Sequence, residues 1–115
     1  MAKSIVSEKA YQFAIKIVQL YLKLKDDRHY ALADQVLRCG TSIGANIEEA
    51  LNGYSRKDFA AKMSISSKEA RECRYWLRLM RDTGLIDENT ANELISEVEE
   101  ISKMLTSIVK STSEK

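Results

Sequence analysis

A row of cations follows one face of a predicted helix in the middle of the chain. Its members recur at steps of three and four residues, the spacing that places side chains on one side of an α-helix. These residues are Lys68, Arg71, Arg74, Arg78 and Arg81, and we call them the basic ridge. Arginines at this spacing can contact successive phosphates, while the neighbouring rings of Tyr75 and Trp76 can stack on exposed bases. The pattern therefore predicts a surface that binds RNA or DNA.

Carboxylates of the same chain offer the basic ridge a different partner. Residues 84–100 hold six acidic side chains and no basic one, whereas residues 53–83 hold eight basic and four acidic ones. If the two segments form an antiparallel hairpin, Glu99 is best placed to meet the ridge, because Glu93 and Glu97 fall on the opposite flank. Exposed pairs of this kind contribute only about 0.2–1 kcal/mol each. The ridge is thus either a phosphate-binding surface or a charged face neutralised within the fold.

Four glutamates on two predicted helices raise the question of a carboxylate-bridged metal centre. They are Glu48, Glu49, Glu69 and Glu72. Bundles with such a centre take a Glu-x-x-His pair from each of two helices, yet the single histidine, His29, falls in a predicted loop. The sequence also lacks a glycine-rich phosphate loop and a nucleophile with a nearby base. We therefore expect no catalysis, no metal and no cofactor.

The composition favours one helical domain. The 115 residues are 44% hydrophobic, which suffices for a single core, and they include no proline and only four glycines. A β-rich protein of this length would need many more turn-forming residues. We expect an all-α domain over residues 1–115, with Cys39 and Cys73 as free, buried thiols because no C-x-x-C pair is present.

The charge and hydropathy of the chain limit its location and partners. Charged side chains interrupt residues 1–21, so these lack the apolar centre of a signal peptide. No stretch reaches the roughly 18 consecutive apolar residues of a membrane-spanning helix. The net charge is only +1, unlike that of a polycation that binds nucleic acid indiscriminately. We expect a cytoplasmic protein without a membrane partner.

Apolar residues recur at steps of three and four along four segments, which predicts four helices. The segments are residues 5–25, 30–52, 55–84 and 88–110. We expect Ser55 and Asp87 to cap the N-termini of the last two helices. Gly53 should end the second helix in the left-handed conformation, and residues 111–115 should fray. Short connections make consecutive helices antiparallel, so the expected architecture is an up-down-up-down four-helix bundle.

The first helix carries a second apolar stripe beside its core stripe. Its residues are Tyr11, Ile15, Val18 and Leu22, and we call them the outer stripe. One core contact does not require apolar residues over this much of a helix surface. The outer stripe therefore predicts a second partner, either another copy of the chain or a different protein.

Small and polar residues crowd the second predicted helix at Gly40, Thr41, Ser42, Gly44 and Asn46. Such residues form helices poorly, and glycine costs about 1 kcal/mol against alanine. Two glycines four residues apart make a flat strip that another helix can approach closely. The hydroxyl and amide groups can then bond across that contact, which we favour, or bond carbonyls of their own helix.

Two stretches of the sequence carry a family resemblance. They are "VLRCGTSIGANIEEA" at residues 36–50 and "SRKDFAAKMSISSKEARECRYWLRLMRDTGLI" at residues 55–86. Both resemble the intervening sequence proteins, four-helix bundle proteins named for reading frames inside insertions in bacterial 23S ribosomal RNA genes. The resemblance covers nearly the whole chain. It implies an antiparallel four-helix bundle that assembles as a homopentameric ring.

The resemblance also marks individual positions as structural or interface residues. They are Ser42, Gly44, Asn46 and Glu49 in the first stretch and Asp58, Phe59 and Glu72 in the second. Glu49 and Glu72 are expected to bond a helix partner or a ring neighbour. The chain departs from many members at Ala50, where they have glycine, and at Glu69, where they have serine.

The family is similar to an accessory protein of diversity-generating retroelements, a basic bundle that binds nucleic acid and a reverse transcriptase. That similarity implies a nucleic-acid or ribonucleoprotein partner for the basic ridge. The near-neutral charge of this chain departs from it. The sequence thus predicts a non-enzymatic pentameric bundle that binds RNA or DNA, with a protein scaffold as the alternative.

Overall fold

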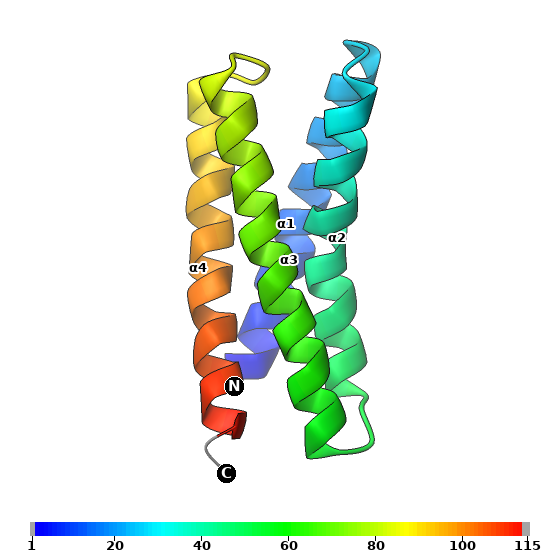
Figure 1. Ribbon diagram of the computed structural model, residues 1–115, viewed down its shortest axis with the longest axis vertical. Helices are drawn as coiled ribbons and strands as arrows, with labels where there is room; N and C mark the ends of the chain where they lie inside the picture. Colours follow the sequence, from blue (N-terminus) through cyan, green and yellow to red (C-terminus); the bar gives the residue numbers. More distant parts are fainter. Residues whose placement is uncertain (1, 114–115) are drawn as a thin grey trace.

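The protein folds into four long helices. The computed structural model describes the backbone of residues 2–113 and the side chains of residues 5–112. The helices are α1 (Ala2–Asp26), α2 (Tyr30–Leu51), α3 (Arg56–Asp82) and α4 (Glu88–Ser113). Each runs opposite to the one before it (Figure 1). The expected all-α four-helix bundle is therefore confirmed.

The bundle is about 46 Å long and 20 Å wide, and its helices pack around one apolar core. Each helix contacts the two beside it, and the α1–α4 contact is the least extensive of the four. One stripe from each helix is buried, as the apolar spacing predicts. Within residues 2–113, no helix is long and apolar enough to cross a membrane.

Side chains cap the two helices whose starts the sequence marks. The Ser55 hydroxyl accepts the backbone N–H of Asp58 at 3.1 Å, which satisfies a donor that the first turn of α3 leaves free. The Asp87 carboxylate accepts both the backbone N–H and the hydroxyl of Thr90, at 2.9 and 2.6 Å. Both predicted caps are confirmed.

The ends of α2 and α4 differ from the expectation. Gly53 does not adopt the left-handed conformation, and Asn52, the residue that follows the end of α2, has an ordinary φ of −102°. The glycine with positive φ is Gly84, which follows α3. Fraying was predicted for residues 111–115, but α4 continues to Ser113, with the Thr112 hydroxyl donating to a carbonyl one turn earlier. Residues 114–115 lie outside the described part of the chain.

The glycines of α2 let α1 approach closely. A Cβ atom added at Gly40 would lie 2.7 Å from Cγ2 of Ile17, so only glycine fits this contact. At Gly44 an added Cβ would lie 3.6 Å from Cβ of Ala10, an ordinary van der Waals distance. The predicted flat strip is therefore present, its partner is α1, and its close point is Gly40.

The polar residues beside these glycines bond their own helix. Thr41 donates to the Leu37 carbonyl, Ser42 to that of Arg38, and Asn46 to that of Ser42, at 2.6–2.8 Å. The cross-helix bonds that we favoured are wrong, because each side chain reaches the carbonyl four residues earlier without leaving its own helix. A buried hydrogen bond does join α2 to α3, and it comes from Ser66. Its buried hydroxyl donates to the Ile43 carbonyl at 2.8 Å.

The two thiols meet in the core between α2 and α3. Cys39 and Cys73 are both free and fully buried. A hydrogen bond with Cys39 raises the pKa of Cys73 well above its ordinary value, and burial raises it further because an apolar core disfavours the thiolate. Cys73 is therefore a neutral thiol within the core.

Candidate functional site

Two members of the basic ridge are bonded inside the bundle. The ridge lies on the flank of α3 that faces α4. Arg74 donates through Nε to Glu99 of α4 at 2.6 Å. Arg81 donates to Asp82 at 2.8 Å, which raises the pKa of its guanidinium, and to the amide oxygen of Asn92 at 2.9 Å. These two arginines are held by neighbouring side chains of the same bundle.

The other ridge cations face solvent. Lys68, Arg71 and Arg78 are exposed, and within the described residues none lies within ion-pair distance of a carboxylate. Arg71 donates to the Ser67 hydroxyl at 3.0 Å, which leaves its charge uncompensated. Tyr75 stands among them with 57% of its surface exposed. We call Lys68, Arg71, Tyr75 and Arg78 the α3 patch.

The second ring beside the ridge is part of the bundle rather than of its surface. Trp76 is partly buried against the core. Tyr75 meets it edge-on, with ring centroids 5.3 Å apart. Within the described residues, the indole Nε1 atom of Trp76 is buried without a hydrogen-bond partner. Tyr75 is therefore the ring that can contact a partner.

Glutamates of the family-like stretches join α2 to α3. Glu72 lies 2.6 Å from the Arg38 guanidinium, and this bond raises the pKa of Arg38. Glu69 lies 3.5 Å from the same guanidinium. Glu49 pairs with Lys62 at 3.0 Å. Each of these carboxylates lies close to a cation of the neighbouring helix. The pairs lie at the interface between α2 and α3, on the side of α3 that faces away from α4.

The remaining positions of those stretches have different neighbours. Asp58 lines a hollow at the turn together with Glu49 and Lys62. Phe59 packs partly buried against the core, and Gly44 contacts α1. Glu69 and Glu72 therefore lie on the flank of α3 that faces α2, whereas Arg74 and Arg81 of the basic ridge lie on the flank that faces α4.

No cluster of the metal-binding kind forms from the four glutamates on α2 and α3. Glu48 accepts a hydrogen bond from Ser7 of α1 at 2.8 Å, so it points away from the other three. Among the residues that the structure describes, no three His, Cys, Asp or Glu side chains gather as metal ligands would.

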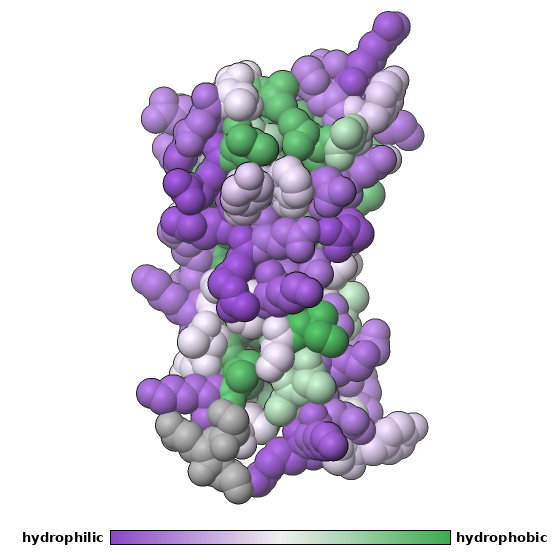
Figure 2. Space-filling view, viewed as in Figure 1, coloured by the Kyte–Doolittle hydropathy of each residue, from purple (hydrophilic) through white to green (hydrophobic). Residues whose placement is uncertain are grey.

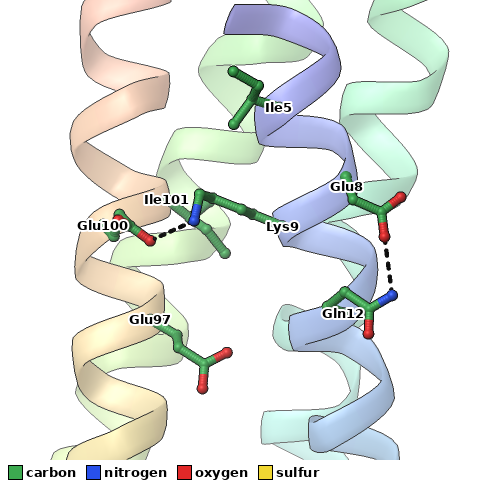
Figure 3. Close-up of a pocket in the computed structure, with 7 residues that line it drawn as sticks. All are labelled: Ile5, Glu8, Lys9, Gln12, Glu97, Glu100 and Ile101. Atoms are coloured by element: carbon green, nitrogen blue, oxygen red, sulfur yellow. Dashed lines mark hydrogen bonds and ion pairs between the residues drawn. The ribbon is translucent and has the colours of Figure 1, made fainter.

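A groove of about 600 Å³ between α1 and α4 was missed by sequence reasoning. We call it the α1–α4 groove, and its walls include Ile5, Glu8, Lys9, Glu97, Glu100 and Ile101. Figure 3 shows Lys9 reaching from α1 to Glu100, with Ile101 behind the pair and Glu97 on the α4 side. Lys9 and Glu100 are 2.9 Å apart. The acidic run at 84–100 was the signal that could have pointed to it.

A second lysine ties the same two helices together. Lys16 of α1 lies 2.7 Å from Glu97 and 2.9 Å from Glu93. Hydrogen bonds to Glu97 and Glu93 raise the pKa of Lys16, and the bond from Lys16 lowers the pKa of Glu93. As the sequence predicts, Glu93 and Glu97 face away from the basic ridge. They belong to the α1–α4 seam.

The outer stripe of α1 is exposed. Tyr11, Ile15, Val18 and Leu22 keep 39–64% of their surface accessible. Figure 2 shows a different face of the bundle, viewed as in Figure 1, where hydrophilic side chains form a band across the middle with apolar surface above and below. The molecule thus presents apolar side chains on more than one side.

Comparison with known proteins identifies the family. The model of the 23S rRNA-intervening sequence protein family matches residues 2–107. No curated protein matches the chain. A crystal structure of a protein with unknown function from the S23 ribosomal protein family of Bacteroides thetaiotaomicron is 41% identical and superposes with a TM-score of 0.92. The alignment covers 96% of this chain and 99% of that one. The chain therefore belongs to the 23S rRNA-intervening sequence protein family.

Proposed function

We propose that this protein is a non-enzymatic assembly protein that forms a homopentameric ring. The observation that carries the proposal is the outer stripe, because large apolar side chains on the solvent face of a charged helix mark an interface. The α1–α4 groove lies along another flank of α1, and its wall includes the half-exposed side chain of Ile5. Neither surface is needed to complete the core of one bundle.

Native mass spectrometry of the full chain, purified at low salt, tests this proposal. We expect a species of five times the 13.1 kDa chain mass. A monomer that persists at rising protein concentration would overturn self-assembly. A defined oligomer of another size would overturn the pentamer alone.

Nucleic-acid binding is a second candidate function, and the α3 patch favours it. Three cations without carboxylate partners surround an exposed tyrosine there, a combination that suits phosphates and a stacked base. Because the net charge of the chain is only +1, the excess of positive charge at the α3 patch is local. If the protein binds no nucleic acid, we propose instead that its exposed surfaces bind protein partners and that it acts as a scaffold.

Binding of a labelled single-stranded RNA at several salt concentrations tests the second candidate. We expect the affinity to fall steeply as salt rises and to be lost in Arg71→Glu/Arg78→Glu. Arg56→Glu is the matched control, because Arg56 is an exposed arginine at the start of the same helix. Equal binding by the wild type and Arg71→Glu/Arg78→Glu would exclude the α3 patch as the site.

A further inference from the structure

We propose that copies of this chain join head to tail, with the α3 patch of one copy seated in the α1–α4 groove of the next. The proposal rests on the self-assembly proposed above, and it assigns the contact between copies to these two surfaces instead of the outer stripe. The occupant of the groove is a second copy of the same chain.

The two surfaces are complementary in chemistry. On the α3 patch, the exposed ring of Tyr75 is flanked one turn away on each side by Arg71 and Arg78. In the α1–α4 groove, the half-exposed side chain of Ile5 supplies apolar contact, while Ile101 beneath it belongs to the core with 1% of its surface exposed. An aromatic side chain that enters an apolar hollow, with charges of opposite sign around it, is the common form of a specific protein interface.

The charges of the two surfaces also match. Three carboxylates, Glu8, Glu97 and Glu100, line the groove beside the single ammonium of Lys9. Lys9 is bonded to Glu100, and within the described residues the Glu8 side chain bonds only the amide of Gln12, at 2.9 Å. Lys16 pairs with Glu97, so Glu8 is the groove carboxylate that has no cation, and the α3 patch is basic. Opposite potentials of this kind speed association and fix its orientation.

The two surfaces lie at the same height along the bundle. The ion pair between Arg74 and Glu99 sets residue 74 of α3 level with residue 99 of α4. Tyr75 follows Arg74 directly, and Glu97, Glu100 and Ile101 lie within two residues of Glu99. The patch and the groove thus face different sides of the molecule at one level.

The equal height of the α3 patch and the α1–α4 groove along the bundle determines which kind of assembly forms. A contact between two different surfaces builds a ring if rotation alone relates the copies, and a filament if a shift along the axis remains. Because the patch and groove are level, rotation about an axis parallel to the helices brings one to the other. The arrangement therefore favours a closed ring.

A second copy explains more of the surface than a nucleic acid does. RNA would compensate the cations of the α3 patch, but the lysines at the groove, Lys9 and Lys16, are already paired with Glu100 and Glu97. It would also leave the groove and Ile5, which is 50% exposed, without a partner. Docking between copies engages both surfaces at once.

Two double variants test the proposal, and each disables one surface. Tyr75→Ser/Arg78→Glu removes the ring and reverses a charge of the patch, while Ile5→Arg/Glu8→Lys fills the groove and reverses its rim. All four side chains are exposed, so the bundle should keep its helical circular dichroism. Glu8→Lys alone replaces the groove variant if the double change unfolds the protein.

Sedimentation velocity measures the mass of each variant and of their mixture. We expect the wild type and the matched control Arg56→Glu to be oligomers, and each double variant to be a monomer. An equal mixture of the two double variants should form a dimer and stop there. One intact patch and one intact groove remain in such a pair, and no free intact surface is left to continue the ring.

The other outcomes separate the two proposals. If the wild type is itself a monomer, self-assembly fails and this inference fails with it. If the wild type is an oligomer, both double variants keep its mass and Leu22→Ser becomes monomeric, the interface is the outer stripe and the docking proposal is wrong. If Tyr75→Ser/Arg78→Glu keeps its mass but no longer binds single-stranded RNA, the patch serves nucleic acid and docking is again overturned.

Discussion

The guanidinium of Arg38 on α2 lies 2.6 Å from the carboxylate of Glu72 and 3.5 Å from that of Glu69, both on α3. The two glutamates differ in exposure, because the Glu69 side chain is only 13% exposed. Within the described residues, its buried Oε2 atom accepts no hydrogen bond. A partly buried carboxylate depends on a nearby cation, so Arg38 compensates Glu69 as well as Glu72.

We expect Arg38→Gln to lower the Tm more than Glu72→Gln, because only the first change leaves Glu69 without a cation. Adding Glu69→Gln to Arg38→Gln should recover part of the loss, since a neutral amide is less costly to bury than a carboxylate. Thermal unfolding followed by circular dichroism measures all three variants, with Arg56→Gln as the exposed control. A larger loss in Glu72→Gln, or no recovery in the double variant, would contradict this account.

We expect Gly40→Ala to destabilise the bundle. The new Cβ would lie 2.7 Å from Cγ2 of Ile17, and overpacking of this kind costs about 1–3 kcal/mol. That exceeds the roughly 1 kcal/mol that alanine gains over glycine in a helix. Urea unfolding measures the difference.

Gly44→Ala is the matched control for this prediction, because its Cβ would make only an ordinary contact with Ala10. It should leave the free energy of unfolding unchanged or raise it by up to about 1 kcal/mol. Ile17→Ala removes both γ carbons that the new Cβ would meet, so Gly40→Ala should cost less in the Ile17→Ala background than in the wild type. Equal effects of alanine at both glycines would show that the α1–α2 contact is not close.

We expect the Asp87 cap to make the free energy of unfolding depend on pH in acidic solution. Hydrogen bonds from the Thr90 hydroxyl and backbone N–H lower the pKa of Asp87 below its ordinary value of 3.8. A lowered folded pKa contributes stability that is fully present above the unfolded value, about 3.8, and is lost as the pH falls through the folded pKa. The stability difference between wild type and Asp87→Ala should therefore be constant at pH 5–7 and shrink in stronger acid.

A nuclear magnetic resonance titration of the Asp87 carboxyl checks the cause of that shift. Thr90→Val removes the hydroxyl donor, so the pKa of Asp87 should move back toward its ordinary value. A pKa that stays the same in Thr90→Val would assign the shift to another group.

We expect both thiols to react only when the bundle opens. Both side chains are buried and inaccessible, and the raised pKa of Cys73 keeps that thiol protonated. Alkylation by iodoacetamide, followed by mass spectrometry, should therefore accelerate with urea in parallel with global unfolding. Rapid labelling in the absence of urea would show that the α2–α3 seam opens locally.

The same pKa shift gives a prediction in alkaline solution. Because the folded pKa of Cys73 is raised, its contribution to stability is fully present below the ordinary value of 9.0 and is lost as the pH rises through the folded pKa. Cys73→Ala should lack this alkaline loss. If the free energies of unfolding of the wild type and Cys73→Ala depend on pH in the same way above pH 9, the pKa of Cys73 is not raised.

Periodicity and capping residues made the helices predictable. The apolar steps of three and four set the buried faces, and the side chains of Ser55 and Asp87 set two of the starts. The same register arithmetic selected Glu99 as the partner for the ridge, and the structure pairs it with Arg74. Each of these features follows from residue spacing along one or two straight helices.

Features that depend on distances between helices could not be predicted from the sequence. Spacing places Ser42 and Asn46 on a flank of α2, but it does not say whether a neighbour or their own backbone is closer. The α1–α4 groove depends on how far apart the first and last helices stand. Ile5 lies outside the core stripe of α1, so its place in that groove left no periodic signal.

The interfaces, or seams, between neighbouring helices also bear on how the chain folds. Three of the four seams join helices that are consecutive in sequence. Only the seam between α1 and α4 brings the two ends of the chain together. Contacts between consecutive elements form fast because little chain entropy is lost in closing short loops. We therefore expect the α1–α4 seam to close last. Its lysine–glutamate bridges are partly exposed, so added salt should speed its opening, and stopped-flow unfolding rates would record that dependence.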